Sequence, residues 1–115
     1  MMNIETYRNY CLRKPGTTEE FPFDNETMVF KVGGKMYALC NVDLFESINL
    51  KCDPEKAVEL REKYASVLPG YHMNKKHWNT VILDGSIPDH LILAWTDHSY
   101  QLVREQLPVR IRKDL

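Results

Sequence analysis

The sequence lacks the features that place a chain in a membrane or stabilise it through disulfides. No apolar run approaches the roughly 18 residues that a membrane-spanning helix needs, and the N-terminus has neither the basic start nor the apolar stretch of a signal peptide. The three cysteines are widely spaced and form no Cys-x-x-Cys pair, which argues against a disulfide scaffold and against a structural zinc site. We therefore expect a cytoplasmic protein without membrane contact, with reduced and buried thiols at Cys11, Cys40 and Cys52.

A net positive charge is also missing. Fifteen lysines and arginines oppose 16 aspartates and glutamates, which gives a net charge of −1. A dedicated DNA-binding protein usually carries a clear positive excess, because neutralisation of phosphates supplies much of its affinity. Any nucleic-acid binding by this chain must therefore depend on a local basic patch.

Motifs of catalysis and metal binding are equally scarce. The chain has no nucleophile elbow, no glycine-rich phosphate loop and no pair of acids at a defined spacing. The available nucleophile couple would be Cys40 or Cys52 with His72 or His77. These two histidines lie five residues apart without a nearby carboxylate, whereas a zinc site needs three or four converging ligands. We therefore expect no enzymatic activity, no metal and no cofactor.

What the sequence does contain is the material of one globular domain over residues 1–115, with 43% apolar and 27% charged residues. Asn3 predicts the cap of a first helix from about Ile4 to Arg13. A loop over 17–25 should follow, and then strands over 27–32 and 35–42 joined by a Gly33-Gly34 turn. In the regular register of that hairpin the expected cross-strand neighbours are Val32 with Lys35, Lys31 with Met36, Phe30 with Tyr37 and Met28 with Leu39.

The second half predicts a strand over 47–52, a helix over 54–65 capped by Asp53, and a strand over 77–83. A final helical region should run from Pro88 to Pro108, as one kinked helix or as two in succession, because Asp97 or Ser99 can cap a second one. The order of elements indicates an α+β fold, a mostly antiparallel sheet with helices packed on one face. The other face should be partly open.

Residues 69–79 form the most distinctive segment, with two histidines, two lysines, two aromatics and two asparagines but no carboxylate. Such a mixture is typical of a surface that contacts a partner, although it also fits a structured basic loop with solvated lysines. Aromatic rings here can stack on bases, lysines can contact phosphates and histidines can donate hydrogen bonds. For Trp78, half-buried packing at a strand start is an alternative. The candidate nucleic-acid-binding residues are Lys35, Lys51, Tyr71, His72, Lys75, Lys76, His77 and Trp78.

Several motifs together resemble the MmcQ/YjbR family. They are Phe21-Pro22-Phe23, Val32-Gly33-Gly34-Lys35-Met36, residues 49–54, Leu60-Arg61, residues 69–79 and Ser99-Tyr100-x-Leu102-Val103, and the resemblance runs from the first helix to Leu107. A position after Pro22-Phe23 that the family often fills with glycine is Asp24 here.

This resemblance implies a CyaY-like fold, an antiparallel sheet flanked by helices, and a small DNA-binding protein similar to double-wing domains. CyaY itself, the bacterial frataxin, binds iron through acidic residues of its first helix. The corresponding helix here has Glu5 as its only acid, beside Arg8 and Arg13. Iron binding is therefore not expected of this chain.

We thus expect a monomeric, non-enzymatic DNA-binding module that uses the open sheet face with modest, salt-dependent affinity. The alternative is a protein–protein or small-ligand module in which residues 71–78 form a pocket wall. A third possibility is a purely structural segment. A continuous positive stripe would favour DNA, acidic neighbours beside a closed apolar pocket would favour a ligand, and burial of His72, Asn74 and Trp78 would favour the structural role.

Overall fold

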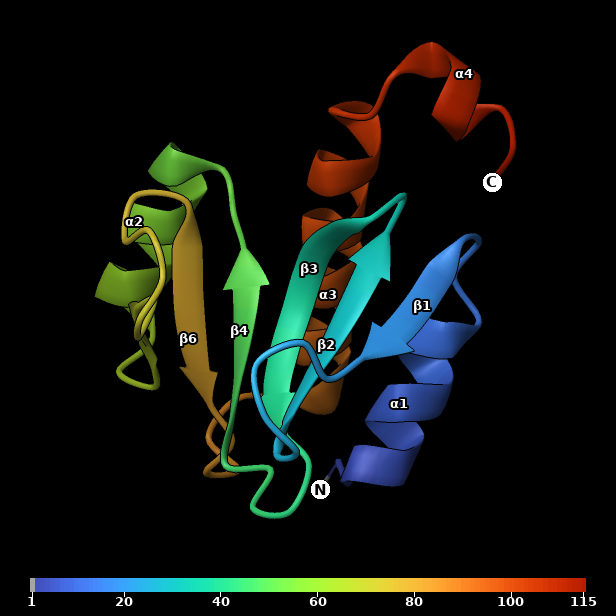
Figure 1. Ribbon diagram of the computed structural model, residues 1–115. Helices are drawn as coiled ribbons and strands as arrows, with labels where there is room; N and C mark the ends of the chain where they lie inside the picture. Colours follow the sequence, from blue (N-terminus) through green and yellow to red (C-terminus); the bar gives the residue numbers. More distant parts are fainter. Residues whose placement is uncertain (1) are drawn as a thin grey trace.

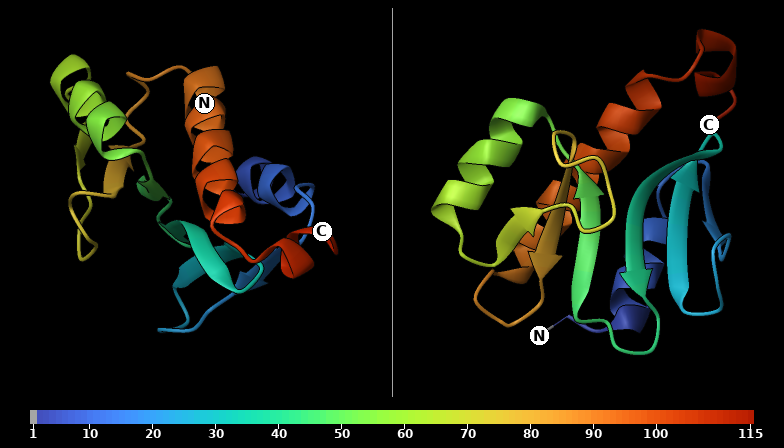
Figure 2. Two further views of the ribbon diagram at one scale, coloured as in Figure 1. Left: turned by 90° about the horizontal axis from the view of Figure 1, so that it is seen from above. Right: turned by 60° about the vertical axis from the view of Figure 1, so that its left-hand side comes forward.

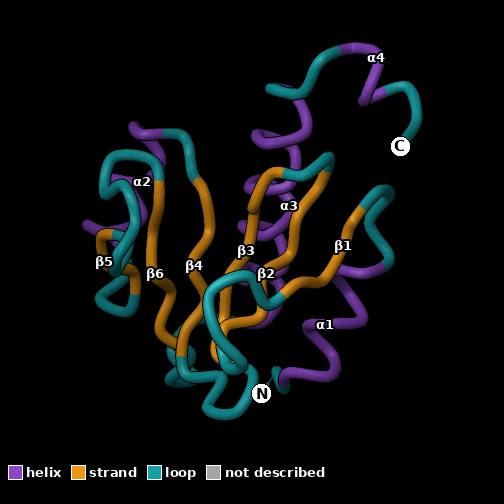
Figure 3. Tube along the Cα trace, in the orientation of Figure 1, coloured by secondary structure: helices purple, strands orange, loops and turns teal. Residues whose placement is uncertain are grey.

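Six strands form one antiparallel sheet in the order β1-β2-β3-β4-β6-β5 in the computed structural model, which describes residues 2–115 (Figure 1). The order confirms the expected α+β class. The two edge strands of the sheet are short: β1 lies beside β2 and β5 lies beside β6 (Figure 3). The strands are β1 (Thr17–Glu20), β2 (Thr27–Val32), β3 (Lys35–Asn41), β4 (Ser47–Lys51), β5 (Val67–Pro69) and β6 (Trp78–Ile82).

Helices α1, α2 and α3 lie on the same face of this sheet, as the view from above shows (Figure 2). Asn3 accepts a hydrogen bond from the amide of Thr6 and Asp53 accepts one from the amide of Lys56, so both predicted caps are confirmed. No helix described within residues 2–115 combines the length and the apolar content needed to cross a bilayer. The helices are α1 (Ile4–Leu12), α2 (Pro54–Lys63), α3 (Asp89–Glu105) and α4 (Val109–Arg112).

Helix α3 is continuous where the sequence suggested a kink or a second cap. The hydroxyl of Ser99 is buried and donates to the carbonyl of Tyr37 at 2.5 Å while it accepts the amide of Lys51 at 2.9 Å. It therefore ties the helix to β3 and β4 instead of capping a new helix. The helix ends at Glu105, ahead of Pro108, and Pro108 then precedes the short α4.

A bulge changes the β2–β3 register. Val32 pairs with Lys35 and Lys31 with Met36 as expected, but Phe30 pairs with Ala38 and Met28 with Cys40, so the other two predicted pairings are wrong. Tyr37 is the extra residue, and its ring packs edge-on against Tyr100 in the core at a centroid distance of 5.3 Å. Because the bulge lets Tyr37 and Ala38 both face the helices, the residues after it change faces.

Two strands were not expected from the sequence. Residues 17–20, predicted as loop, form β1, and β5 lies in the stretch between α2 and β6. The polar sequence of β1 shows no apolar alternation, because an edge strand needs only one partner and buries little. Helix α2 ends at Lys63 rather than Ala65, and Val58 on this helix is 49% exposed.

The face away from the helices carries its own small apolar cluster. Val29, Leu39 and Trp78 are buried there, with Met36 and Met73 packed against them. The loop between β1 and β2 passes in front of the sheet on this side, and the loop before β6 lies beside it (Figure 1). The expected open face is thus covered in part by two loops, which we call the 21–26 loop and the 70–77 loop.

Candidate functional site

The 70–77 loop is shaped by its own side chains. The Asn74 Oδ1 accepts the amides of Lys76 at 2.9 Å and His77 at 3.3 Å, and the Lys75 Nζ donates to the carbonyl of Gly70 at 3.0 Å. Gly70 is packed so tightly that a Cβ would come within 2.8 Å of the Trp78 Cβ. Much of the distinctive composition of residues 69–79 therefore specifies loop conformation.

Helix α2 anchors this loop through Arg61. Its Nε donates to the Oδ1 of buried Asn79 at 2.7 Å, and its Nη2 donates to the carbonyls of Lys75 and Trp78. The side-chain Nδ2 of Asn79 in turn donates to the carbonyl of Ala57 on α2. One guanidinium thus connects a helix, a strand and the loop.

The tip of the loop remains free to contact a partner. Tyr71 is 68% exposed, and the ring of the also exposed His72 lies 4.0 Å from its ring, centroid to centroid, at a tilt of 50°. His72 has a φ of 57°, in the left-handed region that few non-glycine residues adopt. The amide of Tyr71 donates to the hydroxyl of Thr80 at 2.9 Å, which fixes the tip to the sheet.

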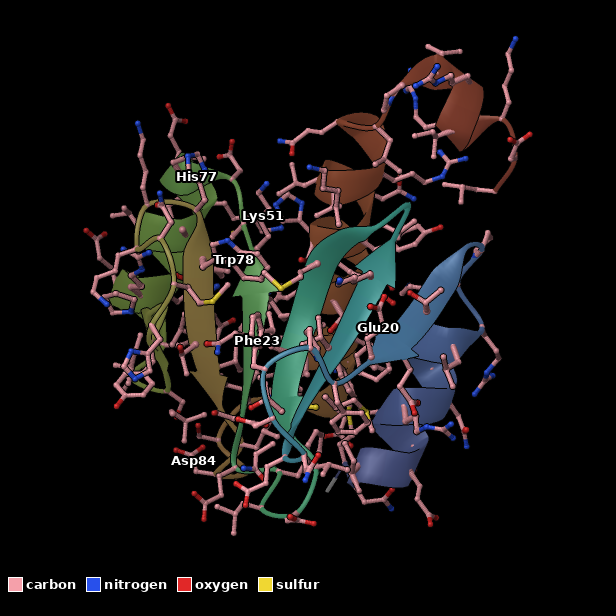
Figure 4. The ribbon with its side chains drawn as sticks, viewed as in Figure 1. Glu20, Phe23, Lys51, His77, Trp78 and Asp84 are labelled. Carbon is pink, nitrogen blue, oxygen red and sulfur yellow. The ribbon has the colours of Figure 1, made fainter. Side chains whose placement is uncertain are left out.

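Between the two loops lies a pocket of about 550 Å³ on the helix-free face of the sheet. Its walls are Phe23 from the 21–26 loop and Tyr71, His72 and Met73 from the 70–77 loop. Figure 4 shows Phe23 lying over the middle of the sheet. Its ring is 64% exposed and so is not part of the buried core.

The floor of the pocket comes from β2, β3 and β4. Apart from Leu39 and Cys40, the floor residues carry a hydroxyl or an amide. No Asp, Glu, Lys or Arg is among the residues that line the pocket. Its volume falls in the range of small-molecule sites, which are mostly apolar with a few placed polar groups. The polar floor residues are Thr27, Asn41, Ser47 and Asn49.

The predicted phosphate contacts gather at one end of the sheet. Lys35 begins β3, Lys51 ends β4, and the loop with Lys75 and Lys76 leads into β6, so antiparallel pairing places all four at the same end. Figure 4 shows His77 close to Lys51 at this end. Lys51 donates to the Oε1 of Gln106, a neutral partner that leaves its charge in place. We call this end of the sheet the basic end.

Acidic residues limit the extent of this charge. Glu20 pairs with Lys31 at 3.3 Å on the side of β1, and Glu55 and Glu59 line a shallow groove together with Lys76. Asp84 follows β6 at the opposite end of the sheet (Figure 4). The face therefore carries a basic end rather than a continuous positive stripe.

The cysteines offer no activated nucleophile beside this site. Burial raises the pKa of Cys40 to about 12 and those of Cys11 and Cys52 to about 11, so each thiol is protonated at neutral pH. Among residues 2–115, no cluster of three or more His, Cys, Asp or Glu side chains is placed to hold a metal ion. The Cys–His couple considered from the sequence therefore lacks its thiolate.

The eight candidate nucleic-acid-binding residues differ in their exposure and in their contacts. Trp78 is buried in the far-face cluster, whereas Tyr71, His72 and Lys76 are exposed. His77 is half-buried, and its carbonyl accepts the amide of Cys52 at 2.7 Å. Sequence reasoning did not select the other half of the pocket, Phe23 and Asn49, although both lie in the family motifs.

Fold and site together define an α+β protein whose sheet carries helices on one face and a loop-walled pocket on the other. The chain belongs to the YjbR family, whose model matches residues 12–102. It is 38% identical over 113 residues to the uncharacterized protein YjbR of Escherichia coli, covering 97% of this chain and 96% of that protein. It is 39% identical to the uncharacterized protein YyaQ of Bacillus subtilis, covering 90% of this chain and 100% of that protein.

Solved structures agree with this assignment. Protein DR2400 of Deinococcus radiodurans, with domain DUF419, superposes with a TM-score of 0.93 at 42% identity, covering 99% of this chain and 88% of that one. A protein from Pseudomonas syringae superposes with a TM-score of 0.74 at 31% identity, covering 89% of this chain and 99% of that one. The fold is therefore shared with these proteins over most of the chain.

Proposed function

We propose that this protein is a non-enzymatic DNA-binding module that holds a single strand on the helix-free face of its sheet. The observation that carries the proposal is the pair of exposed aromatic rings, Phe23 and Tyr71, which border a pocket on the helix-free face of the sheet, between its middle and the end opposite to the basic end. Single-strand-binding proteins combine these two elements, aromatic platforms for bases and a positive surface for phosphates. A duplex fits less well, because its two backbones need a longer positive surface than the basic end supplies.

The charges set the expected strength of binding. Four lysines at the basic end predict a slope of about −3 for the logarithm of the association constant against the logarithm of salt concentration. The acidic residues around Lys31 and Lys76 prevent a larger slope. Binding should therefore be modest and lost at moderate salt.

Fluorescence anisotropy with single-stranded and duplex oligonucleotides at low and moderate salt tests the proposal. Lys76→Glu should weaken binding and reduce the salt slope by about one. Lys63→Glu, the same charge change at the end of α2, should have a smaller effect. Absence of single-strand binding at low salt, or equal effects of the two variants, would contradict the proposal.

A small-ligand module is the second candidate, because the pocket lining carries no Asp, Glu, Lys or Arg. A free ligand bound there should show little salt dependence, since few counterions would be released. Titration of the protein with neutral aromatic compounds, followed by NMR shifts of the 70–77 loop, tests it. Shifts that persist at high salt would favour this candidate over the strand.

A further inference from the structure

We infer that the pocket between the 21–26 and 70–77 loops holds one unstacked nucleobase of the strand, and that it prefers bases with ring carbonyls, such as thymine. The inference rests on the proposed single-strand binding. The lining includes no Asp, Glu, Lys or Arg. A phosphate would find no counter-charge among these residues, whereas a neutral base suits them.

The two asparagines of the pocket floor offer donors rather than acceptors. The Oδ1 of Asn41 accepts the amides of Asp43 and Leu44, both at 2.9 Å, and the Oδ1 of Asn49 accepts the hydroxyl of Thr80. Within residues 2–115, neither Asn41 Nδ2 nor Asn49 Nδ2 donates to a protein acceptor. Each asparagine therefore has its oxygen engaged and its NH₂ group available to a ligand.

This polarity distinguishes the bases. Thymine presents two carbonyl oxygens, one on either side of its ring N–H, and both can accept from NH₂ groups, whereas adenine presents an amino donor beside each of its acceptors N1 and N7. An asparagine that reads adenine uses its oxygen and its nitrogen together, and here the oxygens are already occupied. The floor should therefore favour thymine over adenine.

The walls and the basic end complete the site. Phe23 and the Tyr71–His72 pair supply ring surfaces against which a base can stack. Asn49 and Lys51 are two residues apart on β4, or roughly 7 Å along a strand. The other polar floor residues, Thr27, Asn41 and Ser47, lie toward the opposite end of the sheet, so a base bound at the Asn49 side of the pocket would bring its phosphate nearest to the basic end.

Asn49→Asp is the most direct test. The carboxylate keeps an acceptor for the Thr80 hydroxyl but replaces the free donor with an acceptor. Asn9→Asp, an exposed change on α1 with the same charge, is the matched control. Binding of oligo-dT and oligo-dA is measured for all three proteins by anisotropy at low salt.

The natural protein should bind oligo-dT at least about fivefold more tightly than oligo-dA. Asn49→Asp should abolish that preference, and Asn9→Asp should keep it. As a second variant, Phe23→Ala should weaken oligo-dT binding by about fivefold or more. Leu44→Ala, which removes a side chain from a residue of the same 64% exposure outside the pocket lining, should not.

The outcomes separate the two proposals. No binding of either oligonucleotide at low salt contradicts the DNA-binding function itself. Equal binding of oligo-dT and oligo-dA, or an unchanged preference in Asn49→Asp, contradicts the base pocket while leaving strand binding intact. If thymidine shifts the NMR signals of Asn49 and Tyr71 although the protein binds no oligonucleotide, that result would contradict a DNA strand as the occupant of the pocket.

Discussion

Replacement of Arg61 by alanine should destabilise the protein and loosen the 70–77 loop. The guanidinium donates to Asn79 Oδ1, and Asn79 is only 2% exposed. Without that donor the buried oxygen is left unsatisfied, at a cost of about 1–3 kcal/mol. The carbonyl of Trp78 keeps the amide of Gly70 as a donor, and water can reach the exposed Lys75, so the loss should come mainly from Asn79.

This cost corresponds to a fall in melting temperature of roughly 4–12 °C for a domain of this size. Urea unfolding followed by circular dichroism gives the free energy, and hydrogen exchange should show faster exchange of the amides of residues 70–77. Arg8→Ala is the control, because Arg8 also pairs with an acceptor, Glu19, but near the surface, where such pairs contribute under about 1 kcal/mol. If Arg61→Ala costs no more than Arg8→Ala, the anchoring role is refuted.

Three further predictions concern the rest of the fold. Gly33→Ala should destabilise the hairpin by more than the ~1–2 kcal/mol that a left-handed residue costs, because Gly33 has a φ of +57° and the new Cβ would meet the side chain of Leu107. Gly34→Ala should cost only that amount, because Gly34 has a φ of +83° but open space around the new Cβ. Urea unfolding of the two variants measures both costs. Hydrogen bonds from Ser66 and Ser86 lower the pKa of Asp84 from 3.8 to about 2. The stability that these bonds contribute should therefore be complete above about pH 5 and disappear as the pH falls from about 4 to about 2. Asp84→Asn should remove this pH-dependent part of the free energy of unfolding. The three buried thiols, with raised pKa values, should resist iodoacetamide at pH 8 in the native protein and react together after denaturation, and rapid native labelling of any one would contradict the assigned burial.

Local signals in the sequence identified most of the regular elements. Asn3 and Asp53 mark helix starts because their side chains satisfy amides only three residues away. Alternating apolar residues likewise located β2 and β4. These features depend on near neighbours in the chain, which the sequence displays directly.

Other features depend on partners that are distant in the chain. Ser99 reads as a cap because a polar residue within a helix usually bonds locally, but its partners are Tyr37 and Lys51, on two strands. The strand β1 exists because β2 offers it a free edge. No pattern within residues 17–20 indicates that pairing, so the sequence could not predict it.

The candidate site was predicted in part. The sequence correctly marked residues 69–79 as unusual, but it could not separate residues that shape the loop, such as Asn74, from those at its surface, such as Tyr71. Both kinds of residue are polar or aromatic, and only the folded loop shows which side chains bond to its own backbone. Substitution of Asn74 should therefore disturb the folding of the loop, whereas substitution of Tyr71 should affect the binding of a partner.

The bulge at Tyr37 connects the irregularity of the fold to the pocket. In a regular hairpin Leu39 would face the helices with Met28, and Asn41 would lie on that same face. The extra residue reverses both, so that Leu39 joins the far-face cluster and Asn41 reaches the pocket floor. Tyr37 itself stays on the core side, where its ring packs against Tyr100, and this burial can offset the lost ladder pairing. A bulge held in place by the core therefore determines which polar groups the opposite face presents, and the pocket needs the bulge as much as it needs the loops that form its walls.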